Sequence, residues 1–130
     1  MDAFDSDVLI FAAKDDPRGG RAAARLLTAN PSMGTCIGSV VLLPEVLSLP
    51  LRAGATTEYR RLELLLARID LKPVDTDTAL LAISLGAKYR LKAPDAIHLA
   101  TAVLWGAARF HTNNSKDFGP HITEIEVVLS

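Results

Sequence analysis

Short apolar runs alternate with longer amphipathic segments along the whole chain. The short runs are bounded by polar residues, Gly or Pro, which is typical of buried strands. They predict strands at residues 3–5, 33–39, 70–75, 108–112 and 124–129. The intervening segments carry apolar residues at helical spacing and predict helices at residues 8–14, 21–29, 40–53, 57–69, 78–90 and 94–104. Strands that alternate with helices in this way predict an α/β fold, a three-layer α/β/α sandwich around a central parallel sheet.

Local signals mark where several of these elements begin and how deeply they lie. Ser6 or Asp7 is suited to cap the first helix. Pro94 opens the last helix, because proline is tolerated in the first helical turn. That helix is apolar on nearly all sides, which predicts that it is buried and that Trp105 at its end belongs to the core. Cys36 lies within an apolar run and is predicted to be buried and unreactive.

The length and composition agree with one globular domain. A chain of 130 residues can bury one hydrophobic core, so we expect a single domain over residues 1–130. Hydrophobic residues make up 49% and charged residues 22%, which excludes a disordered or fibrous protein. The formal net charge of -1 provides no basic field over the whole surface. Any contact with nucleic acid must therefore come from a local patch.

The N-terminus and the cysteine content favour the cytoplasm. The first residues are acidic, whereas a secretory signal begins with a positively charged segment. Prolines and charged residues interrupt the apolar stretch at residues 40–53, so no membrane span is expected. The single cysteine excludes an intramolecular disulfide, which agrees with a reducing compartment. We therefore expect a cytoplasmic protein without a membrane segment.

Four acidic residues lie near predicted strand ends or helix starts. Asp5 ends the first strand, Glu45 follows the second, Asp95 begins the last helix and Asp117 follows the fourth strand. The carboxyl ends of parallel strands meet at one edge of a sheet, so these side chains are expected to share one cleft. Carboxylates that lie so close repel one another unless a cation balances them, and Mg²⁺ or Mn²⁺ prefers such oxygen ligands. The pattern predicts metal-dependent hydrolysis of a phosphodiester.

Each of these residues also has a purely structural interpretation. Asp5 fits a helix cap, Asp95 fits the favourable position of an acid at a helix N-terminus, and Asp117 fits an ordinary turn. Glu45 fits a solvated helix edge, although its apolar neighbours make an unpaired charge unfavourable there. His98 is interpreted as a hydrogen-bonded core histidine, with a role as a base as the alternative. Spacing alone leaves these alternatives open.

Further polar residues are candidates for positioning a substrate. Thr112 ends the fourth predicted strand, where its hydroxyl would hold a water or a phosphate, or would satisfy a turn. Lys88, Arg90 and Lys92 lead directly into the last helix and are the preferred set for backbone phosphates of RNA. A solvated helix face is the alternative interpretation of this basic set.

Four segments together resemble PIN-domain nucleases, and most of all the VapC-type toxins of bacterial toxin-antitoxin pairs. These segments are FDSDVLI near the start, PEVL in the first third, PDAIHLATA in the last third and the late TNNSKDF. The resemblance covers nearly the whole chain and implies an α/β/α fold with a parallel sheet. It also implies that acids bind Mg²⁺ or Mn²⁺ for RNA cleavage. Asp5, Glu45 and Asp95 match the first three acids of the family.

The late motif departs from the family pattern. The usual pattern is Thr-x-Asp, in which Thr112 matches the threonine and Asn114 stands where the acid is expected. Asp117 takes over that role if the turn folds back; otherwise it matches only the acid that often precedes Phe in this region. Asn114 retains an amide oxygen as a possible ligand without the charge. Asp7 lies where the family often has a small polar residue, and we interpret it as a cap or as a residue that supports the ligands.

The resemblance implies a Mg²⁺-dependent endoribonuclease that acts as the toxin of a type II toxin-antitoxin pair. The expected catalytic and metal-binding residues are Asp5, Glu45, Asp95 and Asp117. The expected partners are an RNA substrate, a small antitoxin protein and a second copy of the chain in a homodimer.

Two alternatives to this function follow from the same residues. The FDSDVL segment is also similar to the start of haloacid-dehalogenase-like phosphatases, with Asp5 as nucleophile and Asp7 as acid/base. The second alternative is a PIN-like module that binds without catalysis, which the amide at Asn114 suggests. Substitution of Asp7 discriminates the first alternative, and substitution of Asp95 discriminates the second.

Overall fold

A parallel sheet forms the centre of the molecule. The computed structural model describes residues 1–130, except for the side chain of Pro31. Within this described chain the sheet has five strands in the order β3-β2-β1-β4-β5, and every neighbouring pair is parallel. The strands are β1 (Asp2–Phe4), β2 (Cys36–Ser39), β3 (Asp70–Lys72), β4 (Arg109–Thr112) and β5 (Glu126–Leu129). The predicted α/β fold with a parallel sheet is confirmed.

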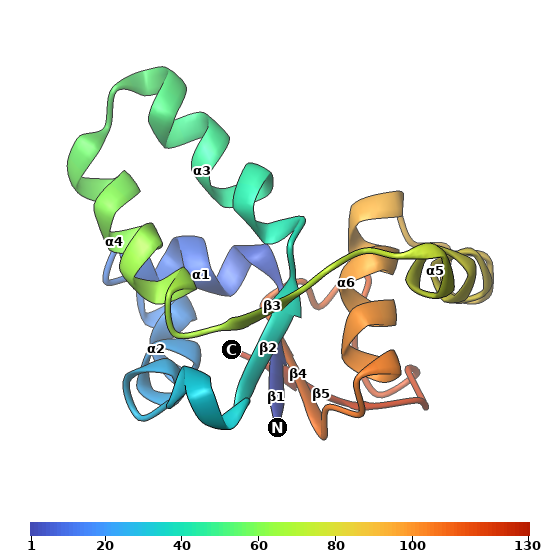
Figure 1. Ribbon diagram of the computed structural model, residues 1–130. Coiled ribbons are helices and arrows are strands. Elements are labelled where there is room, and N and C mark those ends of the chain that lie inside the picture. The colour runs from blue at the N-terminus through green and yellow to red at the C-terminus, as the bar shows by residue number, and fades with distance from the viewer.

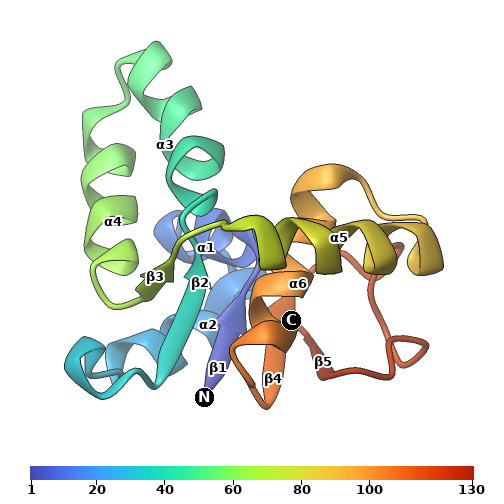
Figure 2. The ribbon, with the colours of Figure 1, turned by 45° about the vertical axis from the view of Figure 1, so that its right-hand side comes forward.

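Helices cover both faces of this sheet. On one face lie α1 (Ser6–Ala13), α2 (Gly20–Leu27), α3 (Leu42–Ala53) and α4 (Thr56–Leu66), and on the other lie α5 (Thr76–Tyr89) and α6 (Ala93–Leu104) (Figures 1 and 2). Two short 3-10 helices, η1 (Pro17–Gly19) and η2 (Pro31–Met33), flank α2. The result is the three-layer arrangement that the alternating pattern predicts.

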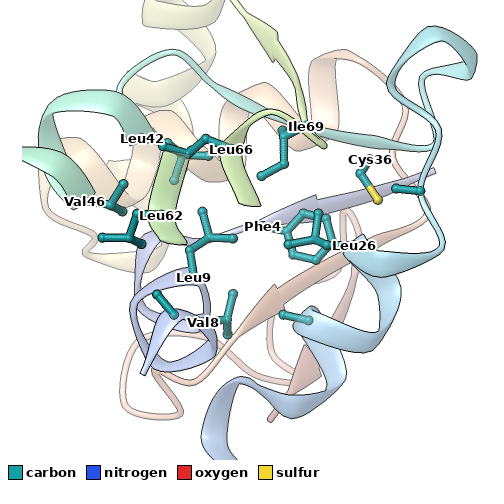
Figure 3. Packing of buried hydrophobic residues seen from close by; sticks show 13 residues of the cluster. Phe4, Val8, Leu9, Leu26, Cys36, Leu42, Val46, Leu62, Leu66 and Ile69 are labelled. Carbon is teal, nitrogen blue, oxygen red and sulfur yellow. The ribbon is translucent and has the colours of Figure 1, made fainter. Parts of the chain in front are cut away.

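Two hydrophobic cores lie on the two faces of the sheet. Alternate side chains of a strand point to opposite faces, so neighbouring residues enter different cores. Phe4 and Cys36 pack with α1, α2, α3 and α4, whereas Ala3 and Ile37 pack with α5 and α6. Figure 3 shows Phe4 in the first core among leucines from several helices. Cys36 is 1% exposed, so the prediction that it is buried is confirmed.

The order of the strands reverses next to β1. The chain builds outward from β1 through β2 to β3, then returns to place β4 on the other side of β1. In this register Phe4 lies opposite His111, so Asp5 follows β1 beside Thr112, the last residue of β4. Ligand sites of open α/β sheets form at such a reversal, outside the carboxyl ends of the strands.

The first turn of α3, the first helix of the long α3–α4 pair, lies beside this edge of the sheet. α3 begins just after β2 ends and, together with α4, extends away from the sheet (Figure 1). Gly54 joins the two helices with a φ of 66°, a left-handed conformation that glycine adopts without strain. Glu45 therefore lies in the helical turn nearest the sheet.

Several local predictions were wrong. Strands β2 and β3 are shorter than expected, because the residues before β2 form η2 and β3 ends at Lys72. The first helix is capped by Asp5, whose side chain accepts a hydrogen bond from the Ser6 backbone N–H, and not by Ser6 or Asp7. Trp105 lies past the end of α6 and is 43% exposed, with the Lys72 ammonium 4.2 Å from its ring centroid. It stabilises the surface by a cation–π contact instead of filling the core.

None of the helices in the described residues is both long enough and apolar enough to cross a membrane.

Candidate active site

Asp5 is the most deeply buried acid at the edge where the strand order reverses. Its residue is 3% exposed, and its carboxylate accepts hydrogen bonds from the Ser6 backbone N–H at 2.8 Å and the Thr112 hydroxyl at 2.9 Å. The Thr112 hydroxyl also accepts the Asn114 backbone N–H at 3.0 Å, which orients its own proton toward Asp5. Burial, together with the charge of Asp95, raises the pKa of Asp5, while these hydrogen bonds oppose the rise. Asp5 is therefore both a helix cap and a member of the site.

Asp95 lies in the first turn of α6 and faces other acids. Pro94 at the start of the helix sets this position, as the sequence predicts. Burial raises the pKa of Asp95, and the charges of Asp117, Glu45 and Asp7 raise it further. Such repulsion requires the carboxylates to lie near one another. The fold thus brings acids from four separate segments of the chain to one edge of the sheet.

Glu45 reaches this edge from α3 and contacts residues of two other helices, α1 and α6. One carboxylate oxygen is hydrogen-bonded to the His98 Nε2, and the other accepts the Ser6 hydroxyl at 3.4 Å. The His98 side chain is fully buried on α6, whereas the Glu45 side chain is 28% exposed. The prediction of a hydrogen-bonded core histidine is confirmed, and its partner is one of the candidate site residues.

Asp7, in the first turn of α1, is a further acid near the candidate site. One of its oxygens accepts the Asn113 backbone N–H at 3.0 Å. The other oxygen is buried and has no hydrogen-bond partner among the described residues. Burial, followed by repulsion from Asp5, raises the pKa of Asp7 to about 6. Asp7 was expected as a cap or a supporting residue, and the structure places it as a support for the turn after β4.

The turn after β4 folds back so that Asp117 approaches Asn114. The Asn114 side-chain amide donates to the Asp117 carboxylate at 3.0 Å, and the Asp117 backbone N–H donates to the Asn114 side-chain oxygen at 3.3 Å. Of the neighbouring charges, that of Asp117 raises the pKa of Asp95 the most. This arrangement favours the interpretation in which Asp117 takes over from the acid missing at position 114.

The basic set before α6 is exposed and points in different directions. Lys88 forms an ion pair with Glu124 at 3.0 Å, which directs it toward the C-terminal segment. Arg90 adopts a left-handed conformation with a φ of 55° and ends α5, and Lys92 precedes the first turn of α6. Of the three residues, Arg90 and Lys92 lie closer in the chain to Asp95 than the paired Lys88 does.

The donor set suits a hard divalent cation, although the side chains do not form a ready-made cage. Among the described residues, no three His, Cys, Asp or Glu side chains are grouped so as to hold a metal ion. In the structure Glu45 is hydrogen-bonded to His98, and Asp117 is hydrogen-bonded to Asn114. The chemistry nevertheless fits, since the candidate groups are carboxylates, burial and then neighbouring acids raise the pKa values of Asp7 and Asp95, and one buried Asp7 oxygen has no hydrogen-bond partner among the described residues.

Sequence reasoning did not assign Ser6 and His98 to this site. The signal for His98 was present, because it follows Asp95 by nearly one helical turn and so lies on the same helix face. The bond to Glu45 could not be inferred, because it joins residues that are 53 positions apart.

These features define a class: a parallel α/β domain with carboxylates gathered where the strand order reverses. Comparison with protein families identifies the particular family. The PIN domain model matches residues 3–118, and the chain belongs to the PIN domain family. The resemblance to PIN domains found in the sequence is thereby confirmed.

Solved structures with the same fold include toxin-antitoxin complexes. One is a toxin-antitoxin complex from Klebsiella pneumoniae, with a TM-score of 0.73 and 26% sequence identity over 97% of this chain and 99% of that chain. Another is VapBC2 from Rickettsia felis bound to a DNA fragment from their promoter, with a TM-score of 0.75, 14% identity and coverage of 98% of this chain and 97% of that chain. The second likeness supports the fold alone. A comparison with curated proteins gave no match.

Proposed function

We propose that this protein is a Mg²⁺- or Mn²⁺-dependent endoribonuclease and the toxin of a type II toxin-antitoxin pair. The observation that carries the proposal is the gathering of the Asp5, Glu45, Asp95 and Asp117 charges at the strand-order reversal of a PIN domain. Neighbouring carboxylates repel one another, and a divalent cation bound between them would balance their charges. The similarity over nearly full length to a chain of a toxin-antitoxin complex supports the biological role.

Asp5 and Asp95 would hold the principal ion, with Glu45 completing the site. Asp117, or the Asn114 side-chain oxygen, would approach a second ion. When bound, such an ion lowers the pKa of a water and neutralises charge on the phosphodiester. The protein's own contribution is orientation: Thr112 and the Ser6 N–H hold the Asp5 carboxylate, and burial keeps the surrounding dielectric low.

Exposed residues would supply contacts to RNA and to protein partners. Arg90 and Lys92 are exposed just before α6 and would bind backbone phosphates, and Lys88 would join them after leaving Glu124. Leu27, Leu51 and Leu64 are largely exposed and would be available to a protein partner. We propose that an antitoxin protein and a second copy of this chain cover such surfaces.

Cleavage of a structured RNA panel by the purified chain tests this function. The reactions contain Mg²⁺, Mn²⁺ or EDTA, and Asp95→Asn is compared with wild type and with Asp77→Asn. Asp77 provides a matched control, because it is an exposed acid in the first turn of α5. We expect metal-dependent cuts that leave a 5′-phosphate and a 3′-hydroxyl in wild type and Asp77→Asn. Asp95→Asn should lose activity by about 100- to 1,000-fold, as expected for removal of one electrostatic group from an active site.

The stability of Asp95→Asn separates lost chemistry from lost folding. The raised pKa of Asp95 means that its charge is unfavourable in the folded chain, so Asp95→Asn should unfold at the same or a higher temperature in EDTA. A folded wild type that cuts no RNA with either metal would contradict the nuclease. A second candidate function, a PIN module that binds without catalysis, would then be favoured by Asn114 at the expected acid position. That function predicts that Asp95→Asn leaves growth inhibition unchanged.

A further inference from the structure

The hydrogen bond between Glu45 and His98 joins two layers of the fold. Glu45 lies on α3 and His98 on α6, and these helices cover opposite faces of the sheet (Figures 1 and 2). On the α3 side the bond starts from the first helical turn, just after the carboxyl end of β2. It therefore connects the site to the interior of α6 directly.

The bonding of His98 is unusual for a residue that only fills space. Its side chain is 0% exposed, and its Nδ1 is buried without a hydrogen-bond partner among the described residues. Its Nε2 contacts the Glu45 carboxylate, which only accepts, so the ring donates from Nε2. A buried polar atom without a partner costs stability, and a leucine would fill a similar space without that cost. The polar contact that His98 makes is to an acid of the site.

Glu45 needs such a contact, because its side chain is long and partly exposed. A free glutamate samples several rotamers, and each ordered side chain loses conformational entropy when it binds a ligand. The His98 Nε2–H holds one carboxylate oxygen, and the Ser6 hydroxyl approaches the other at 3.4 Å. Glu45 is thus held in one orientation before any ligand arrives.

We propose that His98 is a positioning residue for divalent-metal binding, which acts by holding the Glu45 carboxylate among the other acids. The inference rests on the proposed function, since Glu45 matters in this way only if the acids bind a metal. It adds to that function a residue from the buried layer that determines how well the site is preorganised.

Mn²⁺ binding to the full chain tests this role by isothermal titration calorimetry after metal removal with EDTA. His98→Leu removes the donor and keeps an apolar side chain of similar size. His98→Gln places an amide donor where the Nε2 lies and serves as the conservative rescue. His111→Leu is the matched control, because His111 is a second buried histidine and lies on β4. Its ring stacks on Phe4, and its Nε2 lies 3.7 Å from the Asp2 Oδ2 at the amino end of the sheet.

We expect His98→Leu to weaken Mn²⁺ binding by about 10- to 100-fold, the usual effect of losing a residue that orients a metal ligand. His98→Gln should bind within a few-fold of wild type, and His111→Leu should keep the wild-type affinity. In a Glu45→Gln background, His98→Leu should produce no further loss, because the two residues act as one unit. Thermal unfolding in EDTA should show His98→Leu at least as stable as wild type.

Three results would overturn the proposal. One is wild-type Mn²⁺ affinity in His98→Leu, another is an equal loss in His111→Leu, and the third is a further loss in the Glu45→Gln background. Wild-type chain that binds no Mn²⁺ would instead remove the proposed function and this inference with it.

A measurement on wild type covers the case in which His98→Leu does not fold. The ¹⁵N NMR signal of the His98 Nε2 should shift on addition of Mg²⁺, because Glu45 then changes its bonding. An unchanged signal at a Mg²⁺ concentration that shifts the Asp95 carboxyl resonance would overturn the proposal.

Discussion

Asp7 shows how a single charge at the site lowers the stability of the fold. Burial and the charge of Asp5 raise its pKa to about 6 from the usual value of 3.8, so the folded chain binds this proton more tightly than the unfolded chain does. Below about pH 4 the group is protonated in both states and has no effect on the unfolding free energy. Between about pH 4 and pH 6 the unfolded chain ionises this group while the folded chain still binds the proton, so the free energy of unfolding falls over that range and stays lower above it.

We therefore predict that Asp7→Asn stabilises the metal-free protein at pH 7.5 and has little effect near pH 4. Asparagine retains an oxygen that can accept the Asn113 N–H, so the turn after β4 should keep its anchor. Thermal unfolding in EDTA at the two pH values measures the difference. Asp77→Asn, at an exposed acid, should show no such pH dependence. An equal gain for Asp7→Asn at both pH values would contradict the assignment.

Asn114 gives a prediction about the missing acid. In Asn114→Asp a carboxylate replaces the amide that donates to Asp117 at 3.0 Å, so two like charges meet. We expect the free energy of unfolding in EDTA to fall by about 1–4 kcal/mol. This is the range of repulsion energies for two unit charges about 4 Å apart in polar surroundings. Mn²⁺ should reverse this loss of stability. It should also raise the melting temperature of Asn114→Asp more than that of wild type.

Asn30→Asp is the control for that substitution, because Asn30 lies after α2 and bonds to Ser32. Its melting temperature should respond to Mn²⁺ as that of wild type does. Equal Mn²⁺ responses in Asn114→Asp and wild type would count against Asn114 and Asp117 as neighbours of a metal.

At the scale of elements, the contact between α1 and η1 depends on one glycine. A Cβ added at Gly19 would lie 2.2 Å from the Ala12 backbone nitrogen, and the backbone of α1 cannot move aside without disturbing its core face. Gly20, the next residue, has nothing within 4 Å of an added Cβ and already has helical φ and ψ. The two neighbouring glycines thus have opposite roles.

We predict that Gly19→Ala lowers the free energy of unfolding by about 1–3 kcal/mol or more, the cost of overpacking. Gly20→Ala should raise it by about 0.4–1 kcal/mol, because alanine reduces the freedom of the unfolded chain. Urea denaturation of both variants measures these changes. A Gly19→Ala variant as stable as Gly20→Ala would show that α1 and η1 do not pack as described.

At the scale of the whole molecule, the two ends of the sheet have opposite electrostatic character. The acids gather at the carboxyl end, whereas Asp2, at the amino end, is fully buried between Arg25 and Arg109. Burial alone would raise the pKa of Asp2, but the hydrogen bonds from the two arginines lower it below its usual value. One end is therefore stabilised by paired charges, and the other is left with charges that a ligand can balance.

Asp2→Asn should accordingly destabilise the protein at neutral pH, by about 3 kcal/mol or more, as expected when a buried charge pair is broken. The lowered pKa means that the stabilisation is present above about pH 4 and is lost as the pH falls through the folded-state value. The difference from wild type should shrink on acidification below pH 4, and it should have the opposite sign to that of Asp7→Asn. Chemical denaturation at pH 7 and pH 3 measures the difference in unfolding free energy between Asp2→Asn and wild type. An equal difference at both pH values would contradict the pairing of Asp2 with the two arginines.

Periodicity in the sequence was enough to predict the class of fold and most of its elements. Alternation of apolar runs and helical patterns is a local property, and the parallel sheet with helices on both faces follows from it. The same local signals identified Pro94 as a helix start and Cys36 as buried. They failed at Trp105, because whether the end of a helix is covered depends on elements distant in the chain.

The sequence by itself determined which acids are candidates at the edge of the sheet: Asp5, Glu45 and Asp95 at positions that match the family, and Asp117 three residues beyond the expected fourth acid. Only the tertiary structure decided how these groups are held. The strand order brings Thr112 to Asp5, and the crossing of two layers brings His98 to Glu45. Both contacts join residues that are 53 or more positions apart, and no local pattern encodes a distance of that kind.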